Sequence, residues 1–463
     1  MSYRIEKDSI GEIKVLEGKL WGAQTQRSIE NFNIGSDKMP MEVILAFAIL
    51  KKAAAKVNCN LQKIDKKKAK AIMTVCDEIS AGKWNAHFPL KVWQTGSGTQ
   101  THMNVNEVIA NRANELLKEA GIENITVHPN DDVNYGQSSN DTFPTAMHIA
   151  AVLSLKTKLL PSIEIMKSTL QEKSNEFSSV VKIGRTHLQD ATPLTLGQEV
   201  SGWHRMVEKC EKMILDSIEP LMELAIGGTA VGTGVNTHPY FDLFMVKEIS
   251  RITGLPFKAS ENKFQALTSH NEIVYCHGAL KALAADAMKI ANDVRWLASG
   301  PRCGIGEISI PANEPGSSIM PGKVNPTQSE ALTMIAVQIM GNDATIGFAA
   351  SQGNFELNVF KPVIIYNFLQ SSRILADGIT NFTTRCLNGI TANEKTIKDY
   401  VDSSLMLVTA LNPYIGYEKA AEVAKYAFEN NISLKEATLK KKYLKEEQFD
   451  QIMQPKNMIN PQE

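Results

Sequence analysis

A short loop with dense chemistry, GSSIMPGKVNP, occupies residues 316–326. Two glycines, two prolines and two serines in eleven residues exclude a helix or a regular strand. Ser317 supplies a hydroxyl, Lys323 a cation, and Asn325 an amide that both donates and accepts hydrogen bonds. Because a long apolar segment follows from Thr327, we expect the loop to lie at a helix N-terminus, where unpaired N–H groups attract anions. The pattern predicts a carboxylate or phosphate site.

A nucleotide-binding loop is the first alternative for this stretch, since Gly316, Gly322 and Lys323 resemble a phosphate-cradling motif. Five residues separate the two glycines, however, where that motif has four. Val324 also stands where the motif needs a Mg²⁺-binding Ser or Thr. We therefore reject the nucleotide interpretation.

Three further loops are rich in hydroxyls, amides and glycines, and each invites an ordinary interpretation as well as a functional one. A Ser/Thr-rich linker, a helix cap or a structural histidine would explain any of them standing alone. In the functional interpretation the first forms a turn that favours an oxyanion, the second donates hydrogen bonds to a carboxylate, and the third holds further candidates. The candidates are Ser97 and Thr99 in TGSGTQ, Ser138, Ser139 and Asn140 in QSSNDT, and Thr186 and His187 in GRTHLQ.

Composition excludes several classes of protein. Lys and Arg number 49 against 50 Asp and Glu, so the net charge of −1 predicts no attraction to nucleic acid or to a membrane surface. The six cysteines are scattered without a CxxC pair, which argues against a zinc site, an iron–sulfur cluster or a disulfide framework. The N-terminal residues resemble neither a signal peptide nor a transit peptide, and no apolar run approaches the roughly 18 residues of a membrane span. We expect a cytoplasmic protein.

Long helices must position these loops. Apolar residues recur at helical spacing over residues 41–61 and 66–79, and a helix is expected from about Asn104 to Ala120. After Pro144 come five longer segments of the same period: 147–177, 196–226, 263–299, 327–351 and 363–385. Helices of about thirty residues reach about 50 Å, so we expect a bundle of parallel rods.

One of these rods is expected to meet other subunits. Residues 331–342 carry no charge, and apolar side chains point to all sides of the helix. The ends of the chain differ from the bundle: a short hairpin is expected around residues 13–20, and short polar helices follow from about Asn393. A capping box is expected there at Ser433 and Glu436.

Taken in order, these motifs resemble the fumarase/aspartase superfamily. GSSIMPGKVNP is similar to its signature, and TGSGTQ, HPNDDVN, QSSNDTFPTAMH, GRTHLQDATP, GGTAVGTG and SGPRCGIGEISIP are similar to motifs of class II fumarases. The similarity extends over nearly the whole chain. Gly322 and TGSGTQ favour a fumarase, because aspartases usually have Ala at the position of Gly322 and differ around Thr99 and Gln100.

The resemblance implies a mainly α fold of three domains: residues 1–138, a central five-helix bundle over 139–393, and a small helical domain over 394–463. It implies a homotetramer with a twenty-helix core, in which three subunits share each active site. The implied activity is reversible hydration of fumarate to L-malate in the citric acid cycle. The substrate is a small dicarboxylate, and the reaction needs no metal and no cofactor.

The family positions also imply roles for individual residues. Ser317 is expected to act as the base, as an alkoxide whose formation depends on Lys323 and backbone dipoles. His187 handles the water and is oriented by Glu330. A capping box of Thr327 and Glu330 is the ordinary alternative for that glutamate.

Binding roles follow from the same positions. The expected substrate ligands are Ser97, Thr99, Ser138, Ser139, Asn140, Thr186, Lys323 and Asn325. The resemblance also implies a second, peripheral dicarboxylate site at His128, Asn130 and Asp131. Ile125 and Thr126, with Tyr135-Gly136, replace basic residues of that second site, so we expect it to hold dianions poorly.

Two other functions remain open at this point. An ammonia lyase of the aspartase type is the alternative within the superfamily, and comparing L-malate with L-aspartate as substrate would decide. A structural protein that keeps the scaffold is the alternative from another class. Such a protein would be expected to lose Ser317, His187 or Lys323, and all three are present.

Overall fold

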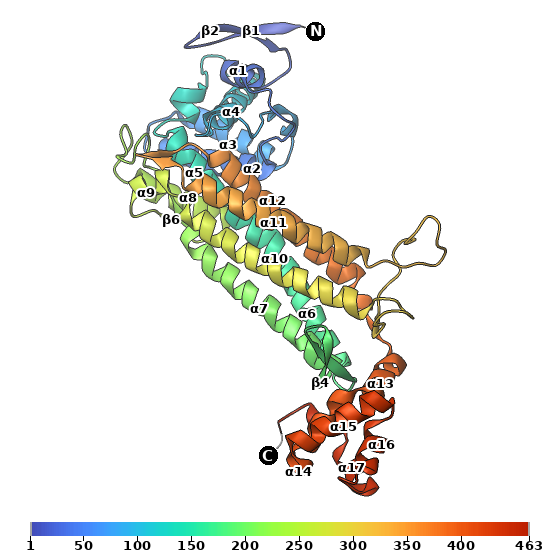
Figure 1. The fold of residues 1–463 in the computed structure, drawn as a ribbon. Coiled ribbons are helices and arrows are strands. Elements are labelled where there is room, and N and C mark those ends of the chain that lie inside the picture. The colour runs from blue at the N-terminus through green and yellow to red at the C-terminus, as the bar shows by residue number, and fades with distance from the viewer. Residues whose placement is uncertain (1, 462–463) are drawn as a thin grey trace. The chain divides into compact units, whose positions relative to one another are not determined.

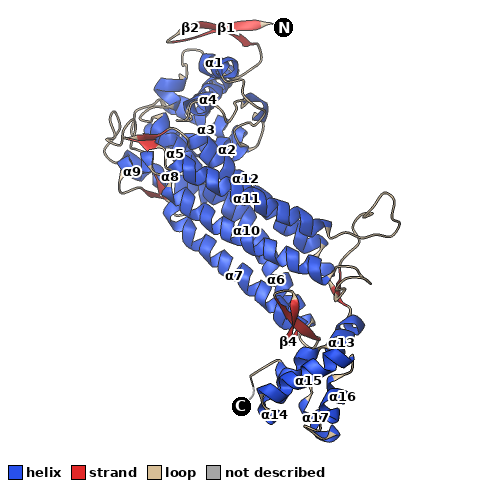
Figure 2. Cartoon of the chain, viewed as in Figure 1, coloured by secondary structure: helices blue, strands red, loops and turns tan. Residues whose placement is uncertain are grey.

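The computed structural model describes residues 2–461, and most of them are helical (Figures 1 and 2). The chain divides into two compact units, each built from three separate segments. The first unit comprises Met1–Pro161, Lys212–Ala282 and Val337–Ala376, and the second comprises Ser162–Glu211, Leu283–Ala336 and Asp377–Glu463. The predicted mainly α fold is confirmed. The predicted boundaries at residues 138 and 393 stay a prediction, because each compact unit combines segments from different parts of the chain and does not test a division into three consecutive domains.

The long helices predicted from the apolar period are present. Those of the N-terminal third are α2 (Met41–Asn60), α3 (Lys66–Ser80) and α4 (Thr99–Glu119). The predicted start of α4 near Asn104 was wrong, because the left-handed Gly98 caps the helix and Thr99 already begins it. In the first unit α2 packs against α3 and α5. The longer helices are α5 (Ser139–Ser154), which continues through a π-helical turn (η3, Leu155–Leu159) into α6 (Leu160–Glu176), then α7 (Leu196–Leu221), α10 (Asn271–Leu297), α11 (Thr327–Ala350) and α12 (Lys361–Arg385).

Three predicted boundaries of the long segments were wrong. The first helix begins at Ser139 rather than Met147, because Ser138 and Asp141 form a capping box and Pro144 is accommodated inside the helix. The second ends at Leu221, before a short strand. The third is broken into α9 (Lys263–Thr268) and α10.

Helix α11 is apolar on more than one side, as its uncharged sequence predicts. Leu332 and Ile339 are buried within the chain. Met334, Val337 and Phe348 are 68%, 61% and 75% exposed on the same helix. The described chain therefore leaves one apolar face of α11 uncovered.

The strands of the described residues form two-stranded ribbons. The largest pairs are β1 (Tyr3–Asp8) with β2 (Gly11–Leu16), and β3 (Val181–Thr186) with β4 (Gln189–Thr195), both antiparallel. The first hairpin lies nearer the N-terminus than residues 13–20, because the Asp8 carboxylate accepts from the N–H groups of Ile10 and Gly11 and closes the turn there. The two-residue strands are β5 (Glu223–Leu224) with β6 (Lys258–Ala259), β7 (Ile308–Ser309) with β10 (Thr391–Ala392), and β8 (Gly353–Asn354) with β9 (Leu357–Asn358).

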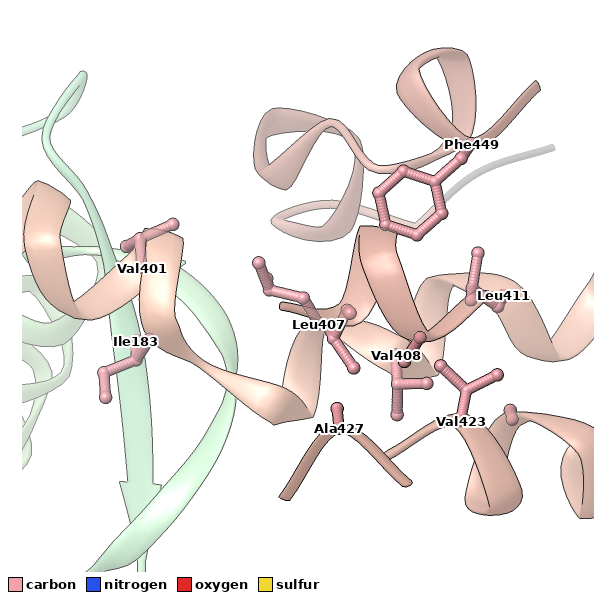
Figure 3. Packing of buried hydrophobic residues seen from close by; sticks show 11 residues of the cluster. Ile183, Val401, Leu407, Val408, Leu411, Val423, Ala427 and Phe449 are labelled. Atoms are coloured by element: carbon pink, nitrogen blue, oxygen red, sulfur yellow. The ribbon is translucent and has the colours of Figure 1, made fainter. Parts of the chain in front are cut away.

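Short helices complete the fold. They are α1 (Ala23–Asn31), α8 (Phe241–Thr253), α13 (Glu394–Ser403), α14 (Asn412–Ile415), α15 (Tyr417–Asn430), α16 (Leu434–Lys440) and α17 (Glu446–Ile452). The 3₁₀ segments are η1 (Asn85–His87), η4 (Leu387–Gly389), η5 (Leu405–Leu411) and η6 (Pro455–Met458), and η2 (Pro129–Val133) is a π-helical turn. The predicted capping box of Ser433 and Glu436 is confirmed at the start of α16. Figure 3 shows the apolar cluster of the C-terminal helices, in which Leu411, Val423 and Phe449 are buried. Among residues 2–461, no helix is long and apolar enough to cross a membrane.

Candidate active site

The Ser317 hydroxyl closes a turn within the signature loop. Its Oγ accepts from the backbone N–H of Ile319 at 3.3 Å and from that of Met320 at 3.1 Å. Hydrogen bonds from N–H groups to an oxygen favour its negatively charged form. These two N–H groups would also stabilise a negative charge on this oxygen.

The two ends of this loop are tied together. The Gly316 N–H donates to the Lys323 carbonyl at 2.8 Å, and the Asn325 amide donates to the Gly316 carbonyl at 2.7 Å. A Cβ at Gly316 would lie only 2.4 Å from the Lys323 carbonyl oxygen, so a glycine is required there. The Lys323 ammonium donates to Asn325 Oδ1 at 2.7 Å, and within residues 2–461 it forms no ion pair with a carboxylate. Its positive charge remains available to an anion.

Glu330 lies in the first turn of α11 and is exposed. Its backbone N–H donates to the Pro326 carbonyl, and the Thr327 hydroxyl bonds to Glu314. The alternative capping box of Thr327 and Glu330 is therefore not formed in the described chain. Helix capping therefore does not explain the presence of the Glu330 carboxylate.

Thr186 and His187 lie at the turn between β3 and β4. His187 and Leu188 have φ values of 57° and 61°, so both adopt the left-handed conformation, and Thr186 and His187 are exposed. No hydrogen bond or ion pair joins the His187 ring to Glu330 among the residues that the structure describes. Their pairing stays a prediction.

A buried charge cluster, which sequence reasoning missed, holds this hairpin. The fully buried Glu307 carboxylate lies 3.2 Å from the Lys182 ammonium and 3.0 Å from the Arg185 guanidinium. Lys182, also buried, lies 3.2 Å from Glu199. Burial raises the pKa of the Glu199 carboxyl, although Lys182 opposes the shift. Since Lys182 and Arg185 both lie on β3, the cluster fixes the strand that ends in Thr186 and His187. Glu307 follows the glycines of SGPRCGIGE, and only its place in that motif could have drawn attention to it.

The first unit contains the other hydroxyl-rich loops. Ser97 Oγ and Thr99 Oγ1 lie 2.9 Å apart at the start of α4. The helix is capped by Gly98, whose φ of 80° and 2.2 Å approach of a Cβ to the Phe143 ring exclude other residues. Both hydroxyls therefore lie at a helix N-terminus, as predicted for an anion site.

The N-terminus of α5 presents Ser138, Ser139 and Asn140. Asp141 Oδ2 accepts from the N–H groups of Gly227 at 3.0 Å and Thr229 at 2.9 Å, which binds the glycine-rich loop to this helix end. Burial raises the pKa of the Asp141 carboxyl, although backbone N–H groups oppose the shift. Asn140 donates to the Ala230 carbonyl at 2.7 Å. Asp141 was missed as a positioning residue because it reads as an ordinary cap.

A cavity of about 670 Å³ lies in front of this helix end, large enough for a small dicarboxylate. Its wall includes Ser138 together with Asn130 and Asp131, so a predicted substrate ligand and part of the predicted second site share it. No Lys or Arg lines this cavity in the described chain. His128 is not part of the wall, and its ring lies 3.1 Å from the Asp131 carboxylate.

The predicted site residues thus form two groups. Ser97, Thr99 and the three residues that open α5 belong to the first unit. The others, Thr186, His187, Ser317, Lys323, Asn325 and Glu330, belong to the second. Each group lies at helix ends or tight turns that present N–H or O–H donors. Within residues 2–461, no three His, Cys, Asp or Glu side chains are arranged to hold a metal ion.

Comparisons with known proteins cover the whole chain. A family model described as lyase matches residues 11–341, and one described as fumarase C C-terminus matches residues 407–460. The chain is 66% identical over 463 residues to a class II fumarate hydratase of Bacillus anthracis and 64% identical over 461 residues to that of Bacillus subtilis strain 168, with 100% of both chains covered each time. It is similar to the crystal structure of a recombinant class II fumarase from Schistosoma mansoni, with a TM-score of 0.96, 43% identity and 99% of each chain covered.

Proposed function

The chain belongs to the class II fumarate hydratase family, as its motifs predicted, and we propose that it catalyses the reversible hydration of fumarate to L-malate. The observation that carries the proposal is the Ser317 hydroxyl, which accepts hydrogen bonds from two backbone N–H groups in the same loop as Lys323, whose ammonium forms no ion pair with a carboxylate of the described residues. The lyase family model would also fit an aspartate ammonia-lyase, but the full-length relatives favour the hydratase.

The chemistry explains why these groups are needed. In the direction from malate, a base removes a weakly acidic C–H proton next to a carboxylate, and negative charge accumulates on that carboxylate. Ser317 is the base, and the Lys323 ammonium stabilises the developing charge. His187 donates a proton to the departing hydroxide, with Glu330 orienting its ring. In the direction of hydration the same groups reverse their roles.

Substrate carboxylates are bound by hydroxyls and amides at helix ends. Thr99 and Ser97 at α4 and Ser138, Ser139 and Asn140 at α5 form one set of donors. Thr186, Lys323 and Asn325 form the other.

Assembly completes the site in this proposal. The uncovered apolar face of α11, with Met334, Val337 and Phe348, supports packing against copies of the same chain, because exposed patches of this kind mark interfaces. We place the helices in a homotetramer whose active sites each draw on three subunits. A second chain then brings Glu330 to His187. The enzyme works in the cytoplasm on a small dicarboxylate.

The proposal is tested by offering the purified protein L-malate or L-aspartate and following the ultraviolet absorbance of fumarate. Fumarate should form from L-malate and not from L-aspartate. Formation from L-aspartate alone would establish an ammonia lyase instead.

A further inference from the structure

A chain of buried polar side chains lies behind Ser139 and has no place in the mechanism above. It begins at Lys51 on α2, whose side chain is only 1% exposed although lysine is almost never fully buried. The ammonium contacts His102 Nε2 at 2.8 Å, Gln137 Oε1 at 2.9 Å and Asn134 Oδ1 at 3.1 Å. None of these partners is a carboxylate. The pKa of Lys51 falls to about 7 because burial penalises the charge.

The direction of these hydrogen bonds fixes the proton on the His102 ring. While Lys51 is protonated its ammonium can only donate, so Nε2 then accepts. Asn106 Nδ2 approaches the same ring nitrogen at 3.2 Å, which agrees with an acceptor there. Burial and then Lys51 keep the pKa of His102 well below its usual value, so the ring is neutral. Its single proton therefore resides on Nδ1.

That proton points at a predicted substrate ligand. His102 Nδ1 lies 2.7 Å from Ser139 Oγ, so the ring donates and the hydroxyl oxygen accepts. The ring cannot turn away, because it stacks on the buried Phe47 with centroids 5.6 Å apart and planes 19° apart. With its oxygen engaged in this way, the Ser139 hydroxyl has its own proton free to donate elsewhere.

We propose that Lys51 and His102 are positioning residues that orient the Ser139 hydroxyl as a hydrogen-bond donor to a substrate carboxylate. This inference rests on the proposed function, in which Ser139 binds that carboxylate. Without Lys51 the Asn106 amide still faces Nε2, but that amide can turn to present its oxygen. The ring could then take its other tautomer, and Ser139 would donate to Nδ1 instead of to the substrate. A purely structural role, in which Lys51 only joins α2 to the loop before α5, is the competing explanation.

Two substitutions of His102 separate these explanations. In His102→Asn the amide nitrogen lies near the position of Nδ1 and can still donate to Ser139. In His102→Gln the amide lies near the position of Nε2, next to Lys51, and leaves Ser139 without its donor. Both amides are smaller than the ring and neutral. We expect the KM for L-malate to stay within about twofold in His102→Asn and to rise about tenfold in His102→Gln, as for the loss of a hydrogen bond to a charged group.

Changes in kcat, in succinate binding and in two further variants show whether His102 acts through Ser139. A side chain that binds a substrate carboxylate acts in the ground state and in the transition state alike. The value of kcat should therefore fall by a smaller factor than the KM rises. The dissociation constant of succinate, an unreactive dicarboxylate, should increase in parallel in calorimetry. Lys51→Met should raise KM in the same way, because it frees the tautomer of His102. In a Ser139→Ala background, His102→Gln should have little further effect.

Equal KM values for the Asn and Gln variants would overturn the proposal, as would an undiminished effect of His102→Gln in the Ser139→Ala background. Thermal unfolding of each variant shows whether a loss of folding contributes. The wild-type enzyme separates this inference from the proposed function. If it converts L-malate, the function stands whatever the variants do.

Discussion

Replacing Ser317 by alanine is the sharpest perturbation of the proposed chemistry. The change removes one oxygen, and the two N–H groups of Ile319 and Met320, in an exposed loop, then lose their acceptor. A hydrogen bond to a charged group contributes about 1.5–3 kcal/mol. Two such bonds stabilise an alkoxide by about 3–6 kcal/mol. Since about 1.4 kcal/mol corresponds to a factor of ten, this is a factor of roughly 10² to 10⁴ in rate.

The expected result is a loss of kcat by a factor of about 10³ or more, since general-base catalysis alone contributes about 10²–10⁴. The alkoxide acts mainly in the transition state, so the dissociation constant of succinate should change by less than about threefold. Stopped-time assays of fumarate formation and calorimetry measure the two quantities.

Ser318 provides the matched control, because it is the next serine in the same loop and is exposed. Ser318→Ala should keep kcat within about twofold, as expected for a surface substitution. If Ser317→Ala retained near-normal turnover, or if the two alanine variants lost activity equally, Ser317 would not be the base.

Three further predictions follow from other parts of the chain. Glu330→Gln should lower kcat strongly with little change in melting temperature, if Glu330 orients His187; a wild-type rate would remove Glu330 from the mechanism. Met334→Asp should place a charge on the uncovered face of α11 and prevent assembly, so sedimentation should show smaller species with little activity; a fully active tetramer would contradict the assembly proposed here. The hydrogen bond from Arg27 lowers the pKa of the Asp8 carboxyl, although burial partly opposes it. The Arg27–Asp8 ion pair therefore stabilises the fold above about pH 3.9, the pKa of Asp in the unfolded chain. This stability is lost as the pH falls through the lower pKa of Asp8 in the folded protein. Asp8→Asn should reduce the melting temperature at pH 7 and much less near pH 3; an equal reduction at both would refute the ion pair.

Local patterns predicted most of the fold. Glycine and proline separated the helices, and the apolar period located α2, α3 and the long helices. The start of α5 was misplaced by eight residues, because Pro144 was taken as a boundary while the capping pair of Ser138 and Asp141 begins the helix earlier. Pro144 is the sixth residue of α5 and lies inside the helix, so the cap and not the proline decided the boundary.

The candidate site was predictable where chemistry is concentrated in one loop. Ser317, Lys323 and Asn325 are neighbours in sequence, and their hydrogen bonds are local. Lys51 and His102 were missed because a lysine within a helical segment is usually solvated. Their contact depends on how α2 and α4 pack together, which the apolar period of either helix alone does not reveal.

The most direct test of the proposed activity supplies fumarate, water and ammonium to the enzyme together and follows the products by proton NMR in D₂O. We predict that fumarate is converted to L-malate carrying one deuterium, at the carbon from which Ser317 removes its proton in the reverse direction. Ser317→Ala should abolish that signal. Accumulation of aspartate in place of malate would contradict the account.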